Sequence, residues 1–566
     1  MNPLEPFVHT SRVAYFSMEI ALRNEIHTYS GGLGVLAGDT LRAAADLELP
    51  LIGVTLISRD GFIRQQIDAN GRQGELPDPW EPERWMTRLD AKIAVQVEGR
   101  RVWVQSWLYV LTGGGGSRIP VVMLDTDLEE NSIRDRDITD RLYGGDAAYR
   151  LKQEVVLGIG GARMLHALGF DIRTYHMNEG HSALLALELL WRYERPPQDV
   201  APGDSRYDTA RVREMCLFTT HTPVEAGHDQ FGYDLVFQMI DDFIPLDELK
   251  RLAGPDVLNM TRLAMNLSSY VNGVARSHAE VSNHMFPGYR VHAVTNGVHG
   301  PTWTHPAIAR LYDQYTPEWR HEPEILVRAD AIPDDELWRA HGVAKDELVQ
   351  RVASLTGVEL EPGLPIFGYA RRMTAYKRPD LLFADLGRLR AISSQTPFQI
   401  ILAGKAHPND QEGKALIERL HQHITELDGG PRVVYLPNYD LEISQTLIPG
   451  SDIWLNTPLP PMEASGTSGM KAAFNGVLNL AVVDGWWHEG LIEGVTGWGI
   501  DAPRGTRDLQ VHATTLYDKL QRVVLPMYYH DREAWVRMMK SSICKNAYYF
   551  NSHRMMRRYA SEAYIR

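Results

Sequence analysis

Residues 399–404 read QIILAG, an apolar run that stops at a glycine. A strand buried on both faces has this composition, whereas a strand with one solvated face alternates apolar and polar residues. Similar β-branched runs recur on both sides of it, and helical patterns follow several of them. This alternation indicates an α/β protein with mainly parallel sheets. The other runs are 13–16, 51–57, 102–110, 121–124, 217–220 and 291–295 in the first half, and 366–369, 433–436, 453–456 and 477–483 in the second.

The strand signals fade between Pro301 and Pro365, where several prolines punctuate the chain. Asp334 and Asp335 then precede a helical pattern, as acidic residues at a helix start do. We therefore predict a hinge here, with one domain over 1–305 and a second over 306–530. The aromatic and basic segment 531–566 has helical spacing and is expected to pack back across the domains. Two such sheets place a ligand between them, at the carboxyl ends of the strands.

Composition excludes several classes of protein. The chain has 58 Lys and Arg against 72 Asp and Glu, a net charge of −14, so we expect neither a nucleic-acid partner nor an anionic membrane. Its two cysteines suit a reducing compartment, and because CxxC and HExxH patterns are absent we predict no metal. The N-terminus lacks a signal-peptide pattern, and no apolar run approaches about 20 residues. These features predict a cytoplasmic protein.

Two groups in the first half are candidates for binding. Clustered glycines at Gly31 and Gly32, followed by Leu33, open a helical pattern. Such glycines allow close backbone approach and present free amides to an anion or a sugar hydroxyl; a tight turn is the alternative. His221 ends the strand 217–220, where it suits a hydrogen-bonding role in a cleft, although a structural histidine fits equally well.

The second half carries a basic stretch directly after the strand 366–369. Residues 370–378 read ARRMTAYKR, which places Arg371, Arg372, Lys377 and Arg378 at a strand end. In an acidic protein such a cluster forms a local anion site. A solvated charge run is the alternative, but the position at a strand end favours the anion site. Lys405, at the next strand end, adds to the positive electrostatic potential of this site.

The most specific pattern is EASGTSGMKAAFNG, residues 463–476. Small residues up to Gly469 expose backbone amides at a helix start, and Lys471 follows in apolar surroundings. An amine in an apolar pocket has a lowered pKa and can form a Schiff base. A lysine that extends from a helix into solvent is the alternative.

Several of these stretches resemble the α-glucan phosphorylases, in the order in which that family has them. EASGTSGMKAAFNG is similar to the family's pyridoxal-phosphate site, YARRMTAYKR to its basic loop KRxxxYKR, and AGKAHP to its GGKAxP strand end. LPNYDLEISQTLIPGSD, residues 436–452, resembles LENYRVSLAEKVIPAAD. YFSMEIAL, SGGLGVLAGDTL, HTPVEAGHD and VTNGVH also match. The resemblance thus runs from about Tyr15 to Gly485.

The resemblance implies a GT-B arrangement, two facing Rossmann-like domains with the active site in the cleft between them. It implies a glycosyltransferase that performs reversible phosphorolysis of an α-1,4-glucan such as glycogen, maltodextrin or starch. The product is α-D-glucose 1-phosphate from the non-reducing end, and the partners are the glucan and inorganic phosphate. The cofactor is pyridoxal 5′-phosphate, anchored on Lys471 as a Schiff base and acting through its phosphate.

The resemblance also assigns roles to residues. The catalytic residues would be Lys471, Arg372, Lys377 and His221. The cofactor would contact Lys471, Thr467, Ser468, Gly469, Tyr439, Arg371 and Lys377. The glucan and the substrate phosphate would contact Gly31, Gly32, Leu33, His221, Glu463, Ser465, Gly466, Arg372 and Lys405.

Regulated members of the family have a longer region before the glycine loop. Only 30 residues precede Gly31 here, so we expect no effector or phosphorylation sites of that kind. We also expect the family's dimer contact to be different or absent, and a homodimer is compatible with the sequence. Trp486, Trp487 and Trp498 suit either stacking on sugar rings or packing in the core.

Two other functions fit parts of the sequence. A sugar-nucleotide-dependent GT-B glucosyltransferase of the glycogen-synthase type shares the architecture. Those enzymes carry a lysine just before the glycine loop, as KxGGLGD, whereas this chain has no lysine there, and they give Lys471 no role. A catalytically silent glucan-binding protein is the other alternative, and the presence of Lys471, Arg372, Lys377 and His221 together argues against it.

Overall fold

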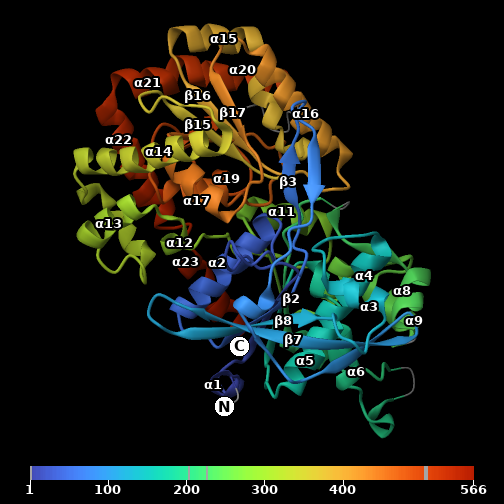
Figure 1. The fold of residues 1–566 in the computed structure, drawn as a ribbon. Helices are drawn as coiled ribbons and strands as arrows, with labels where there is room; N and C mark the ends of the chain where they lie inside the picture. The colour runs from blue at the N-terminus through green and yellow to red at the C-terminus, as the bar shows by residue number, and fades with distance from the viewer. Residues whose placement is uncertain (1–2, 202–203, 225–226, 242, 502–507, 566) are drawn as a thin grey trace.

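Two large sheets, each covered by helices, make up the protein. The computed structural model describes residues 3–201, 204–224, 227–241, 243–501 and 508–565. In Figure 1 the sheet from the first half of the chain lies below the sheet from the second half. The chain is therefore a mixed α/β protein with two parallel-rich sheets, as the alternation of apolar runs predicts.

The first sheet has ten strands in the order β14-β13-β10-β9-β1-β2-β8-β7-β5, with β6 beside β7. The strands from β14 to β8 are parallel, and β5, β6 and β8 are antiparallel to β7. The bounds are β1 (Val13–Ser17), β2 (Leu51–Leu56), β5 (Thr87–Arg88), β6 (Ile93–Val97), β7 (Arg100–Thr112), β8 (Arg118–Asp125), β9 (Thr174–Asn178), β10 (Cys216–Thr219), β13 (Tyr270–Gly273) and β14 (His292–Ala293).

Both faces of this sheet are buried, because alternate residues of β1 enter different cores. Ala14 and Phe16 belong to one hydrophobic cluster, whereas Val13 and Tyr15 belong to another. Burial on both faces is why these strands lack polar alternation. The glycine-rich stretch at 113–116 turns the chain between β7 and β8.

The second sheet has six strands, all parallel, in the order β17-β16-β15-β18-β19-β20. The QIILA run forms β16 and is buried along its whole length. The strand order reverses at β15, so a crevice opens between the carboxyl ends of β15 and β18. The bounds are β15 (Ile366–Ala370), β16 (Gln399–Ala403), β17 (Arg432–Leu436), β18 (Ile453–Asn456), β19 (Leu478–Val482) and β20 (Gly497–Ile500).

Helices cover the sheets, and within the described residues none is long and apolar enough to span a bilayer. In the first half they include α2 (Gly32–Asp46), α4 (Ala147–Val155), α5 (Gly161–Ala167), α6 (Leu185–Arg192), α7 (Thr209–Met215), α8 (Tyr233–Ile240), α9 (Leu246–Ala253), α10 (Met260–Asn266) and α11 (Arg276–Met285). In the second half they include α15 (Leu386–Gln395), α16 (Gln411–Glu426), α17 (Leu441–Gly450), α18 (Ser468–Ala473), α20 (Leu509–Lys519) and α21 (Leu525–His530).

The stretch between the sheets is helical. It contains α12 (Gly300–Trp303), α13 (Pro306–Tyr315), η7 (Pro323–Ala331) and α14 (Asp334–Thr356). Asp334 and Asp335 lie in the first turn of α14, which confirms the predicted helix start. Acidic side chains there interact favourably with the helix dipole.

A hairpin from the first half reaches the second sheet. Its strands are β3 (Arg64–Ile67) and β4 (Gln73–Leu76), and Figure 1 shows it beside α16. Gln65 Nε2 donates to the Gly404 carbonyl at 2.9 Å. Lys405 Nζ donates to the Ile63 carbonyl at 2.9 Å. These contacts hold the strand end that carries Lys405 against the first half.

The C-terminal segment contacts both halves. Its helices are α22 (Arg532–Ser542), η11 (Ile543–Ala547) and α23 (Ser552–Tyr559). Trp535 of α22 lies in a core that includes the second sheet, whereas Met555 of α23 lies in the core around α2. The hydroxyl of Tyr564, after α23, forms a 2.9 Å hydrogen bond with Nδ1 of His176 in β9.

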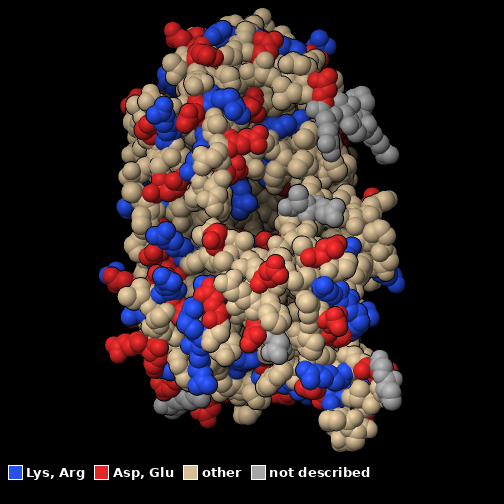
Figure 2. Space-filling view, turned by 90° about the vertical axis from the view of Figure 1, so that its right-hand side faces the viewer, with Lys and Arg blue, Asp and Glu red and all other residues tan. Residues whose placement is uncertain are grey.

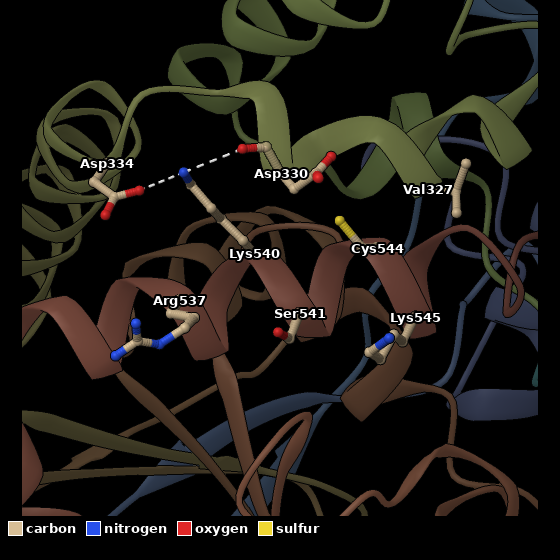
Figure 3. A pocket seen from close by; sticks show the side chains of 8 residues that line it. All are labelled: Val327, Asp330, Asp334, Arg537, Lys540, Ser541, Cys544 and Lys545. Carbon is tan, nitrogen blue, oxygen red and sulfur yellow. Dashed lines mark hydrogen bonds and ion pairs between the residues drawn. The ribbon is translucent and has the colours of Figure 1, made fainter.

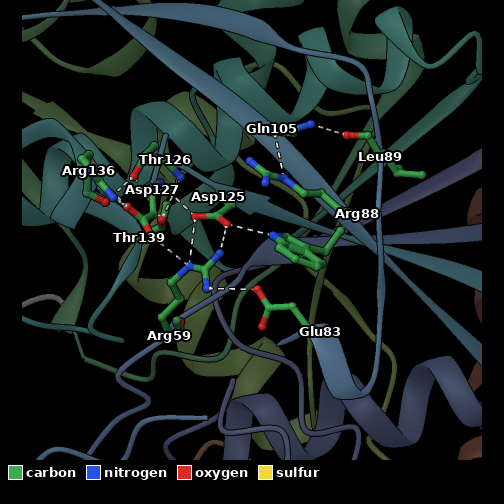
Figure 4. A network of polar contacts seen from close by, with 12 residues as sticks. Arg59, Glu83, Arg88, Leu89, Gln105, Asp125, Thr126, Asp127, Arg136 and Thr139 are labelled. Carbon is green, nitrogen blue, oxygen red and sulfur yellow. Dashed lines mark hydrogen bonds and ion pairs between the residues drawn. The ribbon is translucent and has the colours of Figure 1, made fainter. Parts of the chain in front are cut away.

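A closed polar network stabilises the carboxyl end of β8 (Figure 4). Asp125 forms an ion pair with Arg59 and accepts from Trp107 Nε1 at 2.8 Å. Its other oxygen accepts from the Asp127 amide at 2.9 Å. The Asp125 side chain is 2% exposed, and these partners compensate its buried charge.

Candidate active site

Lys471 lies in α18, directly after the loop that leaves β18. Its side chain is buried, and Nζ lies 3.6 Å from the ring centroid of Trp303 in α12. It forms no ion pair with another described residue. Burial lowers the pKa of Lys471 to about 8, because a low-dielectric site disfavours the ammonium form. The lysine therefore does not extend into solvent, and its amine is partly neutral near physiological pH.

Close packing explains the small residues before Lys471. A Cβ added at Gly469 would lie 2.5 Å from Asn479 Oδ1 and 2.7 Å from the Trp486 ring. Ser468 Oγ accepts from Trp454 Nε1 at 3.0 Å. Thr467 is the N-cap residue of α18, and its side chain makes no capping hydrogen bond.

The three tryptophans after this loop form part of the core. Trp486, Trp487 and Trp498 are each 1% exposed and belong to the same hydrophobic cluster. The structure therefore assigns them to core packing and not to stacking on sugars.

Two cations share one carboxylate at the crevice of the second sheet. Arg371 follows β15, and Lys377 ends the short helix η8 (Ala375–Lys377). Glu463 Oε2 accepts from Arg371 Nη2 at 2.8 Å and from Lys377 Nζ at 2.6 Å. Burial would raise the pKa of Glu463, but the two cations outweigh it and lower the pKa to about 2. These three side chains together keep one positive charge in excess. Asp484 lies beside them and accepts from the Glu463 amide at 2.9 Å, and burial raises the pKa of Asp484 to about 7.

This cluster also contains buried polar atoms without partners. Arg371 Nη1 and Ser465 Oγ are buried and form no hydrogen bond with any residue that the structure describes. Such atoms are rare in native structures, and a bound anion or hydroxyl would satisfy them. Gly466, next to Ser465, has φ of +85°, a conformation that glycine adopts without strain.

Two further basic residues, Arg372 and Lys405, differ in their exposure and their contacts. Arg372 is exposed and forms no hydrogen bond or ion pair with another described residue. Lys405 Nζ donates to the Ile63 carbonyl, and burial lowers the pKa of Lys405. The structure thus brings Arg371 and Lys377 together on Glu463, while Arg372 points to solvent.

The glycine loop is held by a residue that the sequence did not single out. Glu19 Oε2 accepts from the Ser30 amide at 2.6 Å and from the Gly31 amide at 3.2 Å. The prediction that Gly31 presents a free amide is therefore wrong. A Cβ at Gly31 or Gly32 would meet no atom within 4 Å, so the loop borders open space. Leu33 follows in the first turn of α2.

His221 lies at the carboxyl end of β10. Its Nε2 lies 2.7 Å from Asn178 Oδ1, and its amide donates to Glu179 Oε2 at 2.7 Å. Burial lowers the pKa of His221 to about 3, so the ring is neutral. Residues 225–226 of the HTPVEAGHD stretch lie outside the described residues.

Tyr439 and Asp440 precede α17. Tyr439 packs against the hydrophobic cluster around β17, and burial raises the pKa of its hydroxyl. Asp440 Oδ1 accepts from the Ile443 amide at 2.8 Å and caps the helix. The family stretch quoted above has an arginine where this chain has Asp440, so the chain lacks a cation at this position.

Contacts between the halves converge on Lys471. Trp303 Nε1 donates to Asp39 Oδ2 at 2.8 Å, and Asp39 lies in α2, the helix that starts at the glycine loop. Tyr29, before that loop, accepts from the Leu441 amide at 3.1 Å. The glycine loop, the helix α18 that carries Lys471 and the start of α17 after Tyr439 are therefore neighbours, although they are far apart in sequence.

The shape of the surface agrees with a site between the halves. Figure 2 shows the face hollowed between its upper and lower parts, with Lys or Arg side chains at the hollow. A separate cavity of about 440 Å³ lies between η7 and α22 (Figure 3) and contains none of the predicted site residues. Its lining residues are Val327, Asp330, Asp334, Arg537, Lys540, Ser541, Cys544 and Lys545.

Known proteins match the whole chain. A family model described as carbohydrate phosphorylase matches residues 234–489. Maltodextrin phosphorylase from Thermococcus litoralis is 38% identical, over 100% of this chain and 72% of its own length. Glycogen phosphorylase from Mycobacterium tuberculosis is 35% identical, over 98% and 70%. An uncharacterized protein from Methanocaldococcus jannaschii is 31% identical, over 97% and 99%. These matches confirm the resemblance drawn from the motifs, and the chain belongs to the carbohydrate phosphorylase family.

Proposed function

We propose that the chain is an α-glucan phosphorylase. It uses inorganic phosphate to release α-D-glucose 1-phosphate from the non-reducing end of glycogen or maltodextrin, and it requires pyridoxal 5′-phosphate. The relatives named as maltodextrin and glycogen phosphorylases support this function over 98–100% of the chain. The structural observation that carries it is the buried Lys471, whose amine has no ionic partner among the described residues and a lowered pKa.

In this proposal the two sheets are the Rossmann-like domains of a GT-B enzyme, over 1–305 and 306–530, with 531–566 joining them. The reversal of strand order at β15 and the hollow between the sheets support it. The basic residues 371–378 follow the carboxyl end of β15, and the loop that leads to Lys471 in α18 follows the carboxyl end of β18. Crevices of this kind are the usual ligand sites of open parallel sheets.

The residues around Lys471 fit the cofactor. Lys471 would hold its aldehyde carbon, and Arg371 Nη1, now without a partner, would receive its phosphate. Helix N-termini bind phosphate through backbone amides, and the loop before α18 ends at such amides. When bound, the cofactor phosphate supplies a proton donor and acceptor beside the substrate phosphate. The cofactor contacts would be Thr467, Ser468, Gly469, Tyr439, Arg371 and Lys377.

The substrate phosphate would bind at Arg372 and Lys377. Arg372 is free to turn toward a ligand, since no described residue pairs with it. Lys377 already holds Glu463, so a second anion would share its charge. Glucose hydroxyls would lie against Gly31, Gly32, Leu33, His221, Glu463, Ser465, Gly466 and Lys405.

The chain's own groups then favour attack by phosphate instead of water. The glycosidic oxygen takes a proton from the substrate phosphate as its bond to C1 breaks, which leaves the shortened glucan with a free hydroxyl. A phosphate oxygen forms the new bond to C1 and gives glucose 1-phosphate. Cations near the phosphate stabilise the negative charge. The neutral His221 donates from Nε2 to Asn178 Oδ1, so its Nδ1 can accept a hydrogen bond from a sugar hydroxyl without adding charge. Closure of the site excludes water.

Product analysis tests the proposal. The protein loaded with pyridoxal phosphate is incubated with maltodextrin and inorganic phosphate, and glucose 1-phosphate is measured. We expect product that depends on both phosphate and cofactor. Glucosyl transfer from a nucleotide sugar, with no glucose 1-phosphate, would favour the glycogen-synthase-type alternative. Glucan binding with neither reaction would favour the silent binding protein.

A further inference from the structure

Three residues from distant parts of the chain converge near the candidate active site. Asp46 ends α2, His299 precedes α12, and His553 lies in the first turn of α23. Asp46 Oδ2 lies 2.8 Å from His299 Nε2 and 3.2 Å from His553 Nε2. One ligand atom from each residue lies within 4.8 Å of the others. The side chains of Asp46 and His299 are 3% and 8% exposed, and that of His553 is 0% exposed.

His553 is a fully buried imidazole with few polar contacts. Among the described residues its Nδ1 has no hydrogen-bond partner, and its Nε2 has only the 3.2 Å ion-pair contact with Asp46 Oδ2. A buried polar group without a partner costs free energy, so native structures rarely contain one. Its Nε2 lies 3.2 Å from Asp46 Oδ2, close to the separation of two donor atoms on one tetrahedral zinc ion.

The charge of the cluster points to a cation. In the described part of the chain, the ion-pair partners of Asp46 are the two imidazoles, and no Lys or Arg pairs with it. Buried carboxylates are compensated by an opposite charge or a metal ion. A carboxylate and two imidazoles are also the donors that Zn²⁺ prefers among divalent ions.

We propose that Asp46, His299 and His553 form a binding site for a divalent transition-metal ion, with Zn²⁺ as the best match. Zinc binds imidazole nitrogen and carboxylate oxygen at about 2.0–2.2 Å, so tetrahedral donor atoms lie about 3.3 Å apart. The observed separations from Asp46 Oδ2, at 2.8 and 3.2 Å, lie slightly below that value. A water molecule would complete four-fold coordination, as in other sites with three protein ligands.

Further contacts orient two of the ligands. His299 Nδ1 lies 2.6 Å from Thr302 Oγ1, and the Gly114 amide donates to Asp46 Oδ1 at 2.6 Å. Such outer contacts fix the orientation of ligands in metal sites and strengthen binding. They also leave His299 Nε2 and Asp46 Oδ2 facing the centre of the cluster. Gly114 belongs to the exposed β7–β8 hairpin tip, which offers the ion a route from solvent.

The site would join three elements beside Lys471. Its ligands come from α2, which begins at the glycine loop, from the turn into α12, which carries Trp303, and from α23. A bound ion would therefore hold the C-terminal helix against the two elements that surround Lys471. Its role would be structural, because no ligand approaches the Glu463 cluster in sequence or through a contact.

Metal binding by the full-length enzyme tests the proposal. The protein is treated with a chelator, equilibrated with Zn²⁺ and analysed for bound metal, and Co²⁺ is used in parallel for its visible spectrum. We expect one ion per chain, a tetrahedral Co²⁺ spectrum and a Tm that rises with Zn²⁺. The same measurement on Lys471→Ala excludes metal bound to the cofactor.

Variants identify the ligands. His553→Gln, His299→Gln and Asp46→Asn should each weaken Zn²⁺ binding by at least about tenfold. His284→Gln is the matched control, because His284 is exposed on α11. Absence of Zn²⁺ binding in the wild type would overturn the proposal and leave a proton-sharing cluster. Unchanged binding in His299→Gln and Asp46→Asn would also overturn it, even if His553→Gln failed to fold.

Discussion

Asp125 and Glu463 are both buried carboxylates that accept hydrogen bonds from cationic side chains, one at the end of β8 and the other in the crevice of the second sheet. The Asp125 network is closed, because Arg59, Trp107 and the Asp127 amide occupy its oxygens (Figure 4). The Glu463 cluster is open. It leaves Arg371 Nη1 and Ser465 Oγ without hydrogen-bond partners among the described residues, and Arg371, Lys377 and Glu463 together carry one positive charge in excess.

The difference separates charge that stabilises a fold from charge that is available to a ligand. A buried ion pair with all its hydrogen bonds made needs nothing further, and breaking it costs stability alone. A cluster with unpaired donors and excess charge is stabilised by an anion that binds there. The Glu463 cluster is of this second kind, and Lys471 lies in α18, which begins five residues after Glu463.

The largest effect is expected at Lys471. Lys471→Ala should lower phosphate-dependent glucose 1-phosphate release at least about a thousandfold, equivalent to about 4 kcal/mol of activation free energy, because the cofactor loses its anchor. Lys250→Ala, at an exposed lysine on α9, is the matched control and should retain activity. Full activity in Lys471→Ala would assign the cofactor elsewhere.

Glu463→Gln should cost about 3–5 kcal/mol of folding free energy, because two buried cations lose their shared carboxylate. Inorganic phosphate should restore part of this loss, since an anion can replace the missing charge. Thermal unfolding with and without phosphate measures both effects. A Tm that phosphate leaves unchanged would show that the cluster does not receive an anion.

Asp125→Asn should cost about 3 kcal/mol, because Arg59 is 23% exposed and water compensates part of its charge. Phosphate should not restore this loss, and the kcat of the folded protein should stay close to the wild-type value. The same unfolding and product assays report the result. Recovery by phosphate equal to that of Glu463→Gln would remove the distinction between the two carboxylates.

The smallest effect is a pH dependence of cofactor uptake. With a pKa of about 8 for Lys471, about a quarter of its amine is neutral at pH 7.5, against about one in a thousand for an ordinary lysine. Since the neutral amine is the nucleophile, uptake should rise with pH and level off above about pH 8. Absorbance after mixing the apoprotein with pyridoxal phosphate follows the rate. A rise that continues toward pH 10 would indicate a normal lysine pKa.

The sign of the linked stability follows from the same pKa. The unfolded chain binds more protons at Lys471 than the folded chain does between about pH 8 and the ordinary lysine pKa. Stability of the apoprotein therefore rises with pH through that window. Below about pH 8 both states carry the proton, and the penalty for burying the charged lysine is fully present.

The sheets could be predicted from sequence because strands buried on both faces leave an unbroken apolar run, as in QIILAG. β13 was not predicted, because YVNG is short and owes its burial to neighbouring strands. The sequence of the tryptophans after Lys471 fitted either stacking on sugars or packing in the core. Only the folded structure placed them in the core, where Trp486 contacts Trp487 and Phe550, and Trp498 contacts Trp535.

The motifs identified Lys471, Arg371 and Lys377 because each follows a strand end within a short stretch. Glu19 gives no such signal, because it lies 11 residues before Ser30 and 12 residues before Gly31, whose amides it binds. Asp46, His299 and His553 are separated by hundreds of residues, so no spacing pattern could reveal them. Contacts of this kind exist only once the two halves and the C-terminal helix have folded together.

Borohydride reduction followed by peptide mapping tests the central claim most directly. The purified protein is reconstituted with pyridoxal phosphate, reduced and digested, and the modified lysine is identified by mass spectrometry. We predict a single pyridoxyl group on Lys471 in the wild type and none in Lys471→Ala. A modification on another lysine, or no stable modification after reconstitution, would contradict the assignment of Lys471 as the cofactor site.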